Sequence, residues 1–363
     1  MENKINKISF VITDMSSGGA ERVMSLLANY FSRVGIETQI IAIKSDRKIY
    51  PLDERVRFHY IGCPNGNVMK FLYRLKAIRD EVADSDIVIS FLWHCNVYTL
   101  LSNLFSRVPI VISERSDPAS EMRGKFRYFK WFRNLVYRRA DKIVFQTQDA
   151  KKYYKGKLNK KGEVIPNPLT PNLPDPIDER HKELIAAGRL TAQKNMKMMV
   201  AAFEKIHNVF PDYKLIIYGE GEDRIAIERE IKDKKLGANI LMPGFCNNLP
   251  EKMKTAKLFL STSNFEGISN SIIEALALGV PVIATDCPVG GSKEFVKSNY
   301  NGTLVAMNDE KAFGDAVVVL LSDKKRWKEY STNAVSIREK LSVETIGQRW
   351  LHVLCEVRNE YYR

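Results

Sequence analysis

The first part of the chain alternates short β-branched runs with stretches whose apolar residues recur at helical spacing. After the first run, one face of a predicted helix is formed by Val23, Leu26, Leu27, Tyr30, Phe31 and Val34. The runs that predict strands lie at 8–13, 39–44, 86–92, 109–114 and 142–147. Strands that alternate with helices in this way indicate a parallel sheet with crossover helices.

A proline-rich segment interrupts this rhythm. The stretch EVIPNPLTPNLPDPIDE, at 163–179, contains five prolines and is incompatible with regular structure. The strand pattern returns at 183–189, 214–220, 238–245, 257–263 and 280–286. We therefore predict two α/β domains, with the first ending at about residue 168.

Length and composition agree with two ordinary globular domains. The chain has 363 residues, 45% of them hydrophobic, which is enough for two cores. It lacks an apolar run of about 18 residues, and its first apolar segment is too short for a secretory signal, so we expect a cytoplasmic protein. Its five cysteines are scattered, so neither a zinc site nor a disulfide framework is predicted.

Positive charge is concentrated in the first domain. Residues 1–170 contain 29 Lys and Arg against 17 Asp and Glu, a net charge of +12. The remainder of the +13 total, only +1, belongs to residues 171–363. Residues 115–161 alone hold 15 basic and 4 acidic side chains, so this segment faces an anionic partner unless it is merely a solvated surface. Membrane phospholipid, lipid diphosphate and nucleic acid are the candidates.

Ligands of parallel α/β sheets bind beyond the carboxyl ends of the strands, so residues that follow strands are the first candidates. Gly18 and Gly19 follow the first predicted strand, where a glycine turn lets an anion approach a helix N-terminus. The same pair also suits a plain tight turn. The dinucleotide fingerprint G-x-G-x-x-G is absent, so NAD is not expected. We expect no cofactor.

Two cations follow the first strand of the second domain. Arg189 and Lys194 lie in GRLTAQKN, just past the carboxyl end of that strand. Such a pair can bind a diphosphate and stabilise the charge that grows on it as it leaves. The alternative is an ordinary solvated surface, which the anion-friendly stretch GEGED at 219–223 makes less attractive.

The stretch NFEGISNSIIEALALGVPVIA joins a strand, a loop and a helix. Glu266 lies in the loop, where its carboxylate can accept from sugar hydroxyls. The amides of Gly267, Ile268 and Ser269 lie near the helix N-terminus, where a phosphate is favoured. Glu274 follows one or two turns later, at a reach suited to the two hydroxyls of a ribose. Together these residues predict a site for a nucleotide sugar.

Two rival explanations concern carboxylates. Ser271-x-x-Glu274 spells a capping box, which would give Glu274 a structural role. Asp84-Ser85-Asp86 spells the Asp-x-Asp motif of metal-dependent transferases. It precedes its strand, however, and so lies at the edge of the sheet remote from ligands. We expect strand-entry structure there and no metal site.

The residues together resemble the retaining glycosyltransferases of family 4, which share the GT-B fold. SGGAER, SERSD, VIPNPL, AAGRLTAQKN, YGEGEDR and FEGISNSIIEALALGVPVIA match in order over essentially the whole chain. The resemblance implies two Rossmann-like domains facing across a cleft. It also implies that a last helix at about 343–363 leaves the second domain, 169–342, and packs on the first.

The resemblance further implies roles for the donor-side residues. Arg189 and Lys194 would bind the donor diphosphate, Glu266 would contact the transferred sugar and Glu274 would bind the ribose. Gly18 and Gly19 would adjoin the donor phosphates. The sugar would depart with oxocarbenium character and the acceptor would attack from the same face, so no protein nucleophile is required.

Three residues are candidates for the acceptor side in the first domain. His94 follows the strand at 86–92, where it can hydrogen-bond the acceptor. Glu114 and Arg115, at the end of the strand at 109–114, either line the acceptor site or form a structural ion pair.

The basic segment FRYFKWFRNLVYRR, residues 126–139, is amphipathic on a helical wheel. Its aromatic side can lie on an anionic bilayer or pack into its own domain, and we favour packing into the domain with the cations outward. The cations expected to meet an anionic membrane surface or a lipid diphosphate are Arg127, Lys130, Arg133 and Arg138. Nucleic acid is disfavoured, because no known binding module is present and the second domain is nearly neutral.

These expectations combine into one hypothesis. The chain is predicted to be a retaining glycosyltransferase on the inner face of the cytoplasmic membrane. It would move a hexose or N-acetylhexosamine from a nucleotide diphosphate sugar, UDP-linked by preference, to a lipid-linked saccharide in surface polysaccharide synthesis. The alternatives are a membrane-associated sugar-nucleotide binder without turnover and a GT-B-like epimerase or phosphorylase.

Overall fold

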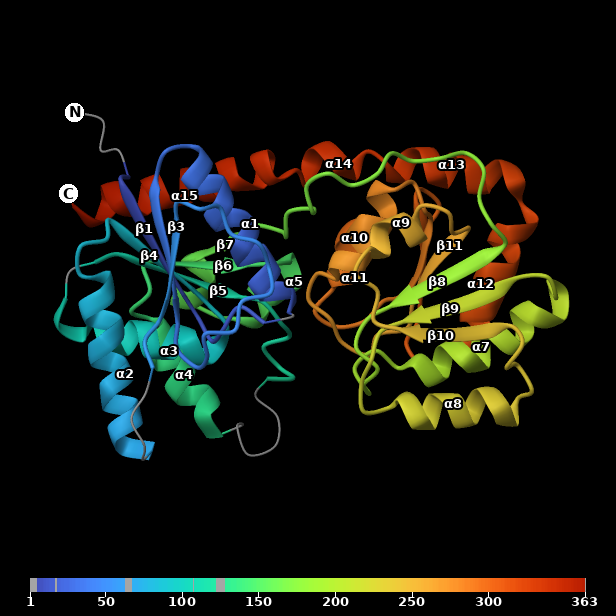
Figure 1. Ribbon diagram of the computed structural model, residues 1–363, viewed down its shortest axis with the longest axis horizontal. Coiled ribbons are helices and arrows are strands. Elements are labelled where there is room, and N and C mark those ends of the chain that lie inside the picture. Colours follow the sequence, from blue (N-terminus) through green and yellow to red (C-terminus); the bar gives the residue numbers. More distant parts are fainter. Residues whose placement is uncertain (1–4, 17, 63–66, 107, 122–127, 363) are drawn as a thin grey trace. The chain divides into compact units, whose positions relative to one another are not determined.

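A computed structural model describes residues 5–16, 18–62, 67–106, 108–121 and 128–362 (Figure 1). The chain folds into two compact units. The N-terminal unit comprises Met1–Pro168 and Leu341–Arg363, and the C-terminal unit comprises Leu169–Lys340. The boundary falls within the proline-rich segment, where fixed φ angles and missing N–H donors exclude helix and sheet.

The N-terminal unit is built on a parallel sheet of seven strands, counted over the described residues, in the order β3-β2-β1-β4-β5-β6-β7. Its inner strands are buried on both faces, which explains their continuous β-branched runs. The strands are β1 (Lys7–Ile12), β2 (Glu37–Ala42), β3 (Val56–Tyr60), β4 (Ile87–Phe91), β5 (Ile110–Glu114), β6 (Lys142–Phe145) and β7 (Gly162–Val164).

Helices cover both faces of this sheet. In Figure 1, α1 and α15 lie over one face, and α2, α3 and α4 lie over the other. On α15, Trp350 is fully buried with its ring 6.0 Å from that of Phe91. Gly347 lets the ring of Tyr30 approach the helix closely, because an added Cβ would lie 2.4 Å from it. The last helix therefore belongs to the core of the N-terminal unit. The helical segments are α1 (Gly19–Arg33), α2 (Asn67–Val82), α3 (Trp93–Ser102), η1 (Asn103–Phe105), α4 (Phe129–Tyr137), α5 (Gln148–Tyr153), α6 (Lys157–Lys160) and α15 (Val343–Tyr361).

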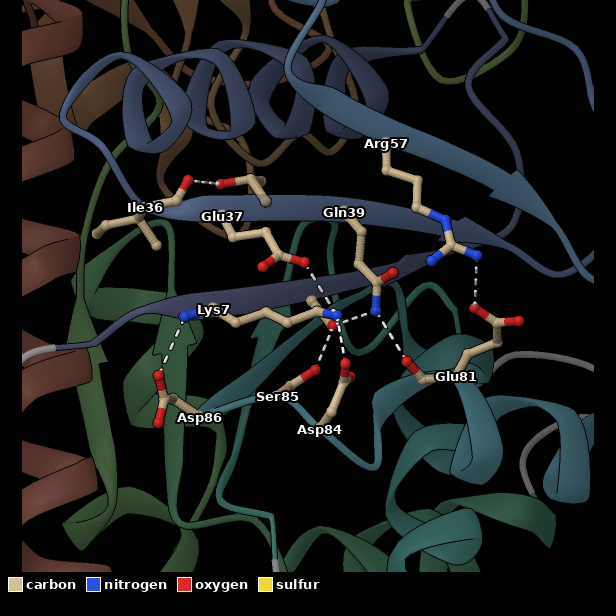
Figure 2. A network of polar contacts seen from close by, with 11 residues as sticks. Lys7, Ile36, Glu37, Gln39, Arg57, Glu81, Asp84, Ser85 and Asp86 are labelled. Carbon is tan, nitrogen blue, oxygen red and sulfur yellow. Dashed lines mark hydrogen bonds and ion pairs between the residues drawn. The ribbon is translucent and has the colours of Figure 1, made fainter.

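The Asp84-Ser85-Asp86 motif lies at the amino edge of this sheet, in the polar network of Figure 2. Asp86 accepts from the backbone N–H of Lys7 at 3.0 Å and from Arg358 of α15 at 2.9 Å. Asp84 pairs with the Lys7 ammonium at 2.6 Å. Both carboxylates thus fasten strand entries and the last helix, as the position of the motif before its strand predicts.

The C-terminal unit repeats the architecture with a parallel sheet of six strands over the described residues, in the order β10-β9-β8-β11-β12-β13. Its helix α7 packs against α8 and α12, and α10 packs against α9, α13 and α14. Phe203, Leu260 and Phe313 are among the buried residues of its core. The strands are β8 (Glu183–Ala187), β9 (Lys214–Tyr218), β10 (Ile240–Gly244), β11 (Leu258–Ser261), β12 (Val282–Thr285) and β13 (Gly302–Val305). The helices are α7 (Met196–Val209), α8 (Arg224–Asp233), α9 (Leu249–Met253), α10 (Asn270–Ala277), α11 (Gly291–Phe295), α12 (Glu310–Ser322), α13 (Lys324–Ala334) and α14 (Ile337–Lys340).

All ten predicted strands are present, and two Rossmann-like parallel sheets confirm the predicted fold class. Three strands escaped prediction: β3, β7 and β13. Within the described residues, we find no helix with both the length and the apolar character needed to span a bilayer. Nor do the described side chains include a cluster of three or more His, Cys, Asp or Glu residues arranged to hold a metal ion.

Candidate active site

In the C-terminal unit, glycines allow two loops at the carboxyl edge of the sheet to pack backbone against backbone. Gly188 follows β8, and its N–H donates to the carbonyl of Tyr218 at the end of β9 at 3.0 Å. A Cβ on Gly219 would lie 1.9 Å from the carbonyl oxygen of Gly188, and one on Gly221 would lie 2.2 Å from that of Leu190. Only glycine permits these approaches, so GRL at 188–190 and GEG at 219–221 form one fixed edge.

A second glycine contact joins the loops that follow β11 and β12. A Cβ on Gly291 would lie 1.6 Å from the carbonyl oxygen of Gly267. Beside it, the N–H of Glu266 donates to the carbonyl of Pro288 at 2.9 Å. The loop that carries Glu266 is therefore held by backbone contacts on both sides before its side chain is considered.

Lys194 and Glu266 form an ion pair on this scaffold. The Lys194 ammonium lies 2.7 Å from one carboxylate oxygen of Glu266 and 2.5 Å from the other. Ser263 donates its hydroxyl to the same carboxylate at 2.8 Å. Thr262 fixes the backbone beneath the lysine by donating to the carbonyl of Asn195 at 2.9 Å. Each charged side chain is 13% exposed, so the pair is largely desolvated yet still reachable.

Arg189 and Glu274 occupy very different positions in the same unit. Arg189 is exposed, and its guanidinium has no hydrogen bond or ion pair within the described part of the chain. Glu274 is 3% exposed on α10 and accepts from the hydroxyl of Thr170 at 2.7 Å. Its ribose-binding role stays a prediction.

The capping-box explanation of Glu274 is wrong. Helix α10 begins at Asn270 with Ser269 as its N-cap, so Ser271 lies inside the helix and does not cap it. Ser269 and Ile268 are buried, and Gly267 is half-buried, at the start of this helix. The helix start therefore lies next to Glu266, where N–H groups and the helix dipole favour an anion.

In the N-terminal unit, His94 lies in the first turn of α3, directly after β4. Its Nε2 is 2.6 Å from the hydroxyl of Thr13, which follows β1. Burial, followed by the positive charges of Lys44 and Arg74, lowers the pKa of His94 below its ordinary value. The ring is therefore neutral at pH 7 and serves as a hydrogen-bonding group rather than a cation.

The Gly18–Gly19 turn opens α1 in the same unit. Gly18 is the N-cap, and a Cβ there would lie 1.9 Å from a carboxylate oxygen of Glu21. Glu21 is the third residue of α1, in its first turn, where the helix dipole favours a carboxylate. Glycine at position 18 thus makes room for the Glu21 side chain, and this packing gives the first glycine of the motif a structural role.

Glu114 and Arg115 are both buried, and they do not pair with one another. Glu114 accepts from the hydroxyl of Tyr154 at 3.1 Å and from the amide of Asn96 at 3.3 Å. Arg115 donates to Asn167 at 2.9 Å, and its guanidinium lies 4.2 Å from the centre of the Phe91 ring. The ion pair given as the alternative for them is therefore not formed, and their place on the acceptor side stays a prediction.

The basic segment contradicts the predicted orientation of its helix. Arg133 is fully buried, whereas Trp131 is 72% exposed. Lys130 and Arg138 are exposed, as an anion-binding role requires, and Arg127 lies outside the described residues. Arg133 is therefore no surface cation, and the aromatic side of the helix faces outward instead of into the domain.

The physical reason is a buried polar pocket under α4. Burial opposes the charge of Arg133, but the electrostatic influence of Tyr154 and Glu114 outweighs it and raises the pKa of the guanidinium. Arg133 also lies 5.1 Å from the Tyr154 ring and donates to the carbonyl of Pro118 at 3.4 Å. A helical wheel treats every cation as a surface residue and so has no means of showing this pocket.

Comparison with known proteins assigns the class. Residues 17–173 match the family model described as Glycosyltransferase Family 4, and residues 174–336 match Glycosyl transferases group 1. The structure of Anabaena Alr3699/HepE, in complex with UDP and glucose, superposes with a TM-score of 0.80 at 18% identity, covering 96% of this chain and 99% of that one. The chain is a GT-B glycosyltransferase.

Curated relatives of this glycosyltransferase extend over its full length. One is the GalNAc-alpha-(1->4)-GalNAc-alpha-(1->3)-diNAcBac-PP-undecaprenol alpha-1,4-N-acetyl-D-galactosaminyltransferase of Campylobacter jejuni, which is 29% identical over 97% of this chain and 99% of its own length. Another is the amylovoran biosynthesis glycosyltransferase AmsD of Erwinia amylovora, which is 25% identical over 96% of this chain and 99% of its own length. Both names describe enzymes of glycan assembly.

Proposed function

We propose that this glycosyltransferase moves a hexose or N-acetylhexosamine from a UDP-sugar to a lipid-linked saccharide, with retention at the anomeric carbon. The observation that carries the proposal is the ion pair of Lys194 and Glu266 among the glycine-lined loops of the C-terminal unit. It places a cation and a carboxylate side by side, as a sugar diphosphate requires.

The two members of the pair would serve different parts of the donor. A diphosphate oxygen competes with Glu266 for the Lys194 ammonium, because both are anions that the same cation can bind. Once relieved of that bond, the carboxylate can accept hydrogen bonds from the sugar hydroxyls. Donor binding would thus redistribute an existing charge pair instead of desolvating two new charges, which lowers its cost.

Departure of the sugar leaves negative charge on the diphosphate. Lys194, the exposed Arg189 and the N–H groups at the start of α10 would stabilise that charge as it develops. A hydroxyl of the acceptor would then attack from the face that the diphosphate leaves. The proton passes from the acceptor hydroxyl to a leaving phosphate oxygen, so the step requires no protein nucleophile.

The N-terminal unit would bind the acceptor. His94, neutral and bonded to Thr13, can accept from or donate to a sugar hydroxyl without adding charge. The Campylobacter relative is named for an undecaprenol diphosphate acceptor, which supports a lipid-linked saccharide here. A protein that uses such an acceptor would work peripherally on the inner face of the cytoplasmic membrane.

A panel of sugar nucleotides tests the proposal. Purified protein is incubated with each donor, with and without a lipid diphosphate-linked saccharide, and free nucleoside diphosphate is measured. Acceptor-dependent release of UDP from one donor is the expected result, with retention read from the anomeric signal of the product. Donor binding without turnover would instead identify a sugar-nucleotide sensor.

Variants of the ion pair test the site itself. Lys194→Met and Glu266→Gln should each lower transfer about a hundredfold or more, because each removes charge that acts on the transition state. Glu204→Gln is the matched control, since it breaks an exposed Lys–Glu pair of 2.6 Å in the same unit. Near-normal transfer in both site variants would refute the assignment.

A further inference from the structure

The outward side of α4 carries large apolar residues where a soluble helix normally carries polar ones. Trp131 is 72% exposed, Leu135 45% and Phe132 37%. They follow the i, i+1, i+4 spacing and so form one stripe along the helix. The buried side of the same helix holds Arg133, Val136 and Tyr137.

Helix α2 carries a second stripe of the same form. Val68 is 72% exposed, Met69 63% and Leu72 55%, again at i, i+1 and i+4. The opposite side of α2 is anchored by Ile78, which is fully buried. Single exposed apolar residues are ordinary on a protein surface, but two matching stripes of large ones are not.

The two helices belong to one layer. Both pack against α3, which lies between them on the same face of the sheet (Figure 1). The ring of Phe71 on α2 lies 5.4 Å from that of Tyr98 on α3. Since α2 follows β3 and α4 follows β5, their first turns also lie at the carboxyl edge of the parallel sheet, the edge that holds His94.

Positive charge surrounds the stripes. Neither 68–79 nor 128–139 contains an Asp or Glu, while the two segments together hold eight Lys and Arg, of which only Arg133 is fully buried; Asp80 and Glu81 follow at the far end of α2. Lys76, Lys130, Arg138 and Arg139 are exposed. Aromatic and aliphatic side chains edged by cations match an anionic bilayer, whose interior takes the apolar groups while its headgroups attract the cations.

A second copy of this chain fits the surface poorly. A two-fold contact would place the face against itself and so set cations opposite cations. An anionic bilayer has no such conflict, and it takes up indole and phenyl groups at its interface.

We propose that the face formed by Val68, Met69, Leu72, Trp131, Phe132 and Leu135 inserts into the surface of an anionic membrane. Arg133 is the positioning residue: by turning inward toward Glu114 and Tyr154, it directs the apolar stripe of α4 outward. The inference rests on the proposed function for its purpose, because insertion beside His94 would bring a lipid-linked acceptor to that edge of the sheet.

Vesicle flotation with apolar-to-serine variants tests insertion. The full chain is mixed with vesicles of phosphatidylglycerol and phosphatidylcholine or of phosphatidylcholine alone. The wild type should float with the anionic vesicles and retain part of its binding in high salt, which screens the cations but not the apolar contact. Trp131→Ser combined with Leu72→Ser should weaken binding roughly tenfold or more.

Ile225→Ser is the matched control, because Ile225 is equally exposed, at 72%, on α8 of the C-terminal unit. It should bind as the wild type does. Lipids brominated in their acyl chains should quench the fluorescence of Trp131. Trp131→Phe should retain vesicle binding and lose that quenching.

Two outcomes would overturn the inference. One is unchanged vesicle binding of the Trp131→Ser and Leu72→Ser variant. The other is a wild type that ignores vesicles and forms a dimer or a complex with an acidic protein that Trp131→Ser dissociates. Transfer to a short-chain, water-soluble acceptor separates the two hypotheses: intact transfer without vesicle binding defeats insertion alone, and vesicle binding without transfer from any donor defeats the proposed function alone.

Discussion

In the C-terminal unit, Lys194 and Glu266 each keep 13% of their side chain exposed, whereas Arg133 of the N-terminal unit is fully buried and Glu114 is 2% exposed. The first pair contact directly and can exchange a partner for a ligand. The second two residues influence one another through a packed pocket of tyrosines. Charged side chains near the carboxyl edges of two similar sheets thus form an accessible ion pair, which we propose binds the donor, in one unit and a buried pocket under a helix in the other.

The difference shows that position in the fold does not by itself make a charged residue functional. At both edges a strand ends and a cation or carboxylate follows, so their sequences look alike. What separates them is whether backbone or side chains fill the neighbouring space. Around Glu266 the backbone of Gly267 and Gly291 packs closely, whereas around Glu114 the side chains of Tyr137 and Tyr154 fill the space.

Removing the buried cation should have the largest effect on stability. Arg133→Met leaves the Glu114 carboxylate in its pocket without a compensating charge, so the free energy of unfolding should fall by about 3–5 kcal/mol. Lys130→Met, an exposed position on the same helix, should change it by less than about 0.5 kcal/mol. Urea denaturation measures both, and equal small effects would mean that Arg133 is not needed to hold α4.

Adding one methyl group at the edge of the C-terminal unit should come next. Gly291→Ala forces a Cβ to within 1.6 Å of the Gly267 carbonyl oxygen, so the two loops must separate. We expect a loss of about 2–3 kcal/mol in unfolding free energy and weaker donor binding. Gly237→Ala is the control, since its Cβ would meet nothing within 4 Å. A stable Gly291→Ala variant with normal donor affinity would show that these loops tolerate separation.

The sequence predicts the architecture well because strand patterns and strand direction are local signals. The ten predicted strands are found, and Asp84 and Asp86 serve strand entry because they precede β4. The missed strands are short or interrupted by charge, such as β3 with Arg57 and His59. Edge strands need only one buried face, so their patterns are weaker.

The sequence names the residues of the candidate site, whose roles stay predictions, but not the contacts among them. Lys194 and Glu266 both stand at strand ends, yet their pairing joins positions 72 residues apart. Ser263 and Thr13 were missed, although each follows a strand, because a single hydroxyl gives no pattern. The predicted orientation of α4 was wrong for a related reason. Its helical wheel is compatible with either face turned inward, and the tertiary contacts of Arg133 decide which face is buried.

The pH dependence of stability gives a sharper measure of the buried pocket. Burial, followed by the charge of Glu114, raises the pKa of Glu121 to about 8 from an ordinary 4.5. The unfolded chain therefore releases this proton at lower pH than the folded one does. Its contribution to stability is complete below about pH 4.5 and is lost as the pH rises through 8.

Glu121→Gln removes that titration. Relative to the wild type, the variant should gain about 3–4 kcal/mol of unfolding free energy between pH 5 and pH 8. Denaturant unfolding at the two pH values gives the comparison, and Glu163→Gln on β7 serves as a carboxylate control. A parallel pH profile for wild type and Glu121→Gln would place the titrating group elsewhere.

Neutralising the exposed cations should have the smallest effect of these substitutions. It also distinguishes their role from that of the buried Arg133 most directly. Lys130→Gln with Arg138→Gln leaves the buried pocket and the apolar stripes intact, so the fold and the donor affinity should not change. Each charge near an anionic bilayer contributes about 1 kcal/mol at low salt, so the loss of two should weaken binding to phosphatidylglycerol vesicles by at most about thirtyfold. The difference from the wild type should shrink as salt is added, since salt screens the attraction of the cations and leaves the apolar contacts of Trp131 and Leu72.

If the loss of the two charges weakened binding as much as the loss of the apolar pair at every salt concentration, attraction to headgroups rather than insertion would dominate binding. The roles assigned to the buried cation, which orients the helix, and to the exposed cations, which attract the membrane, would then have to be assigned differently.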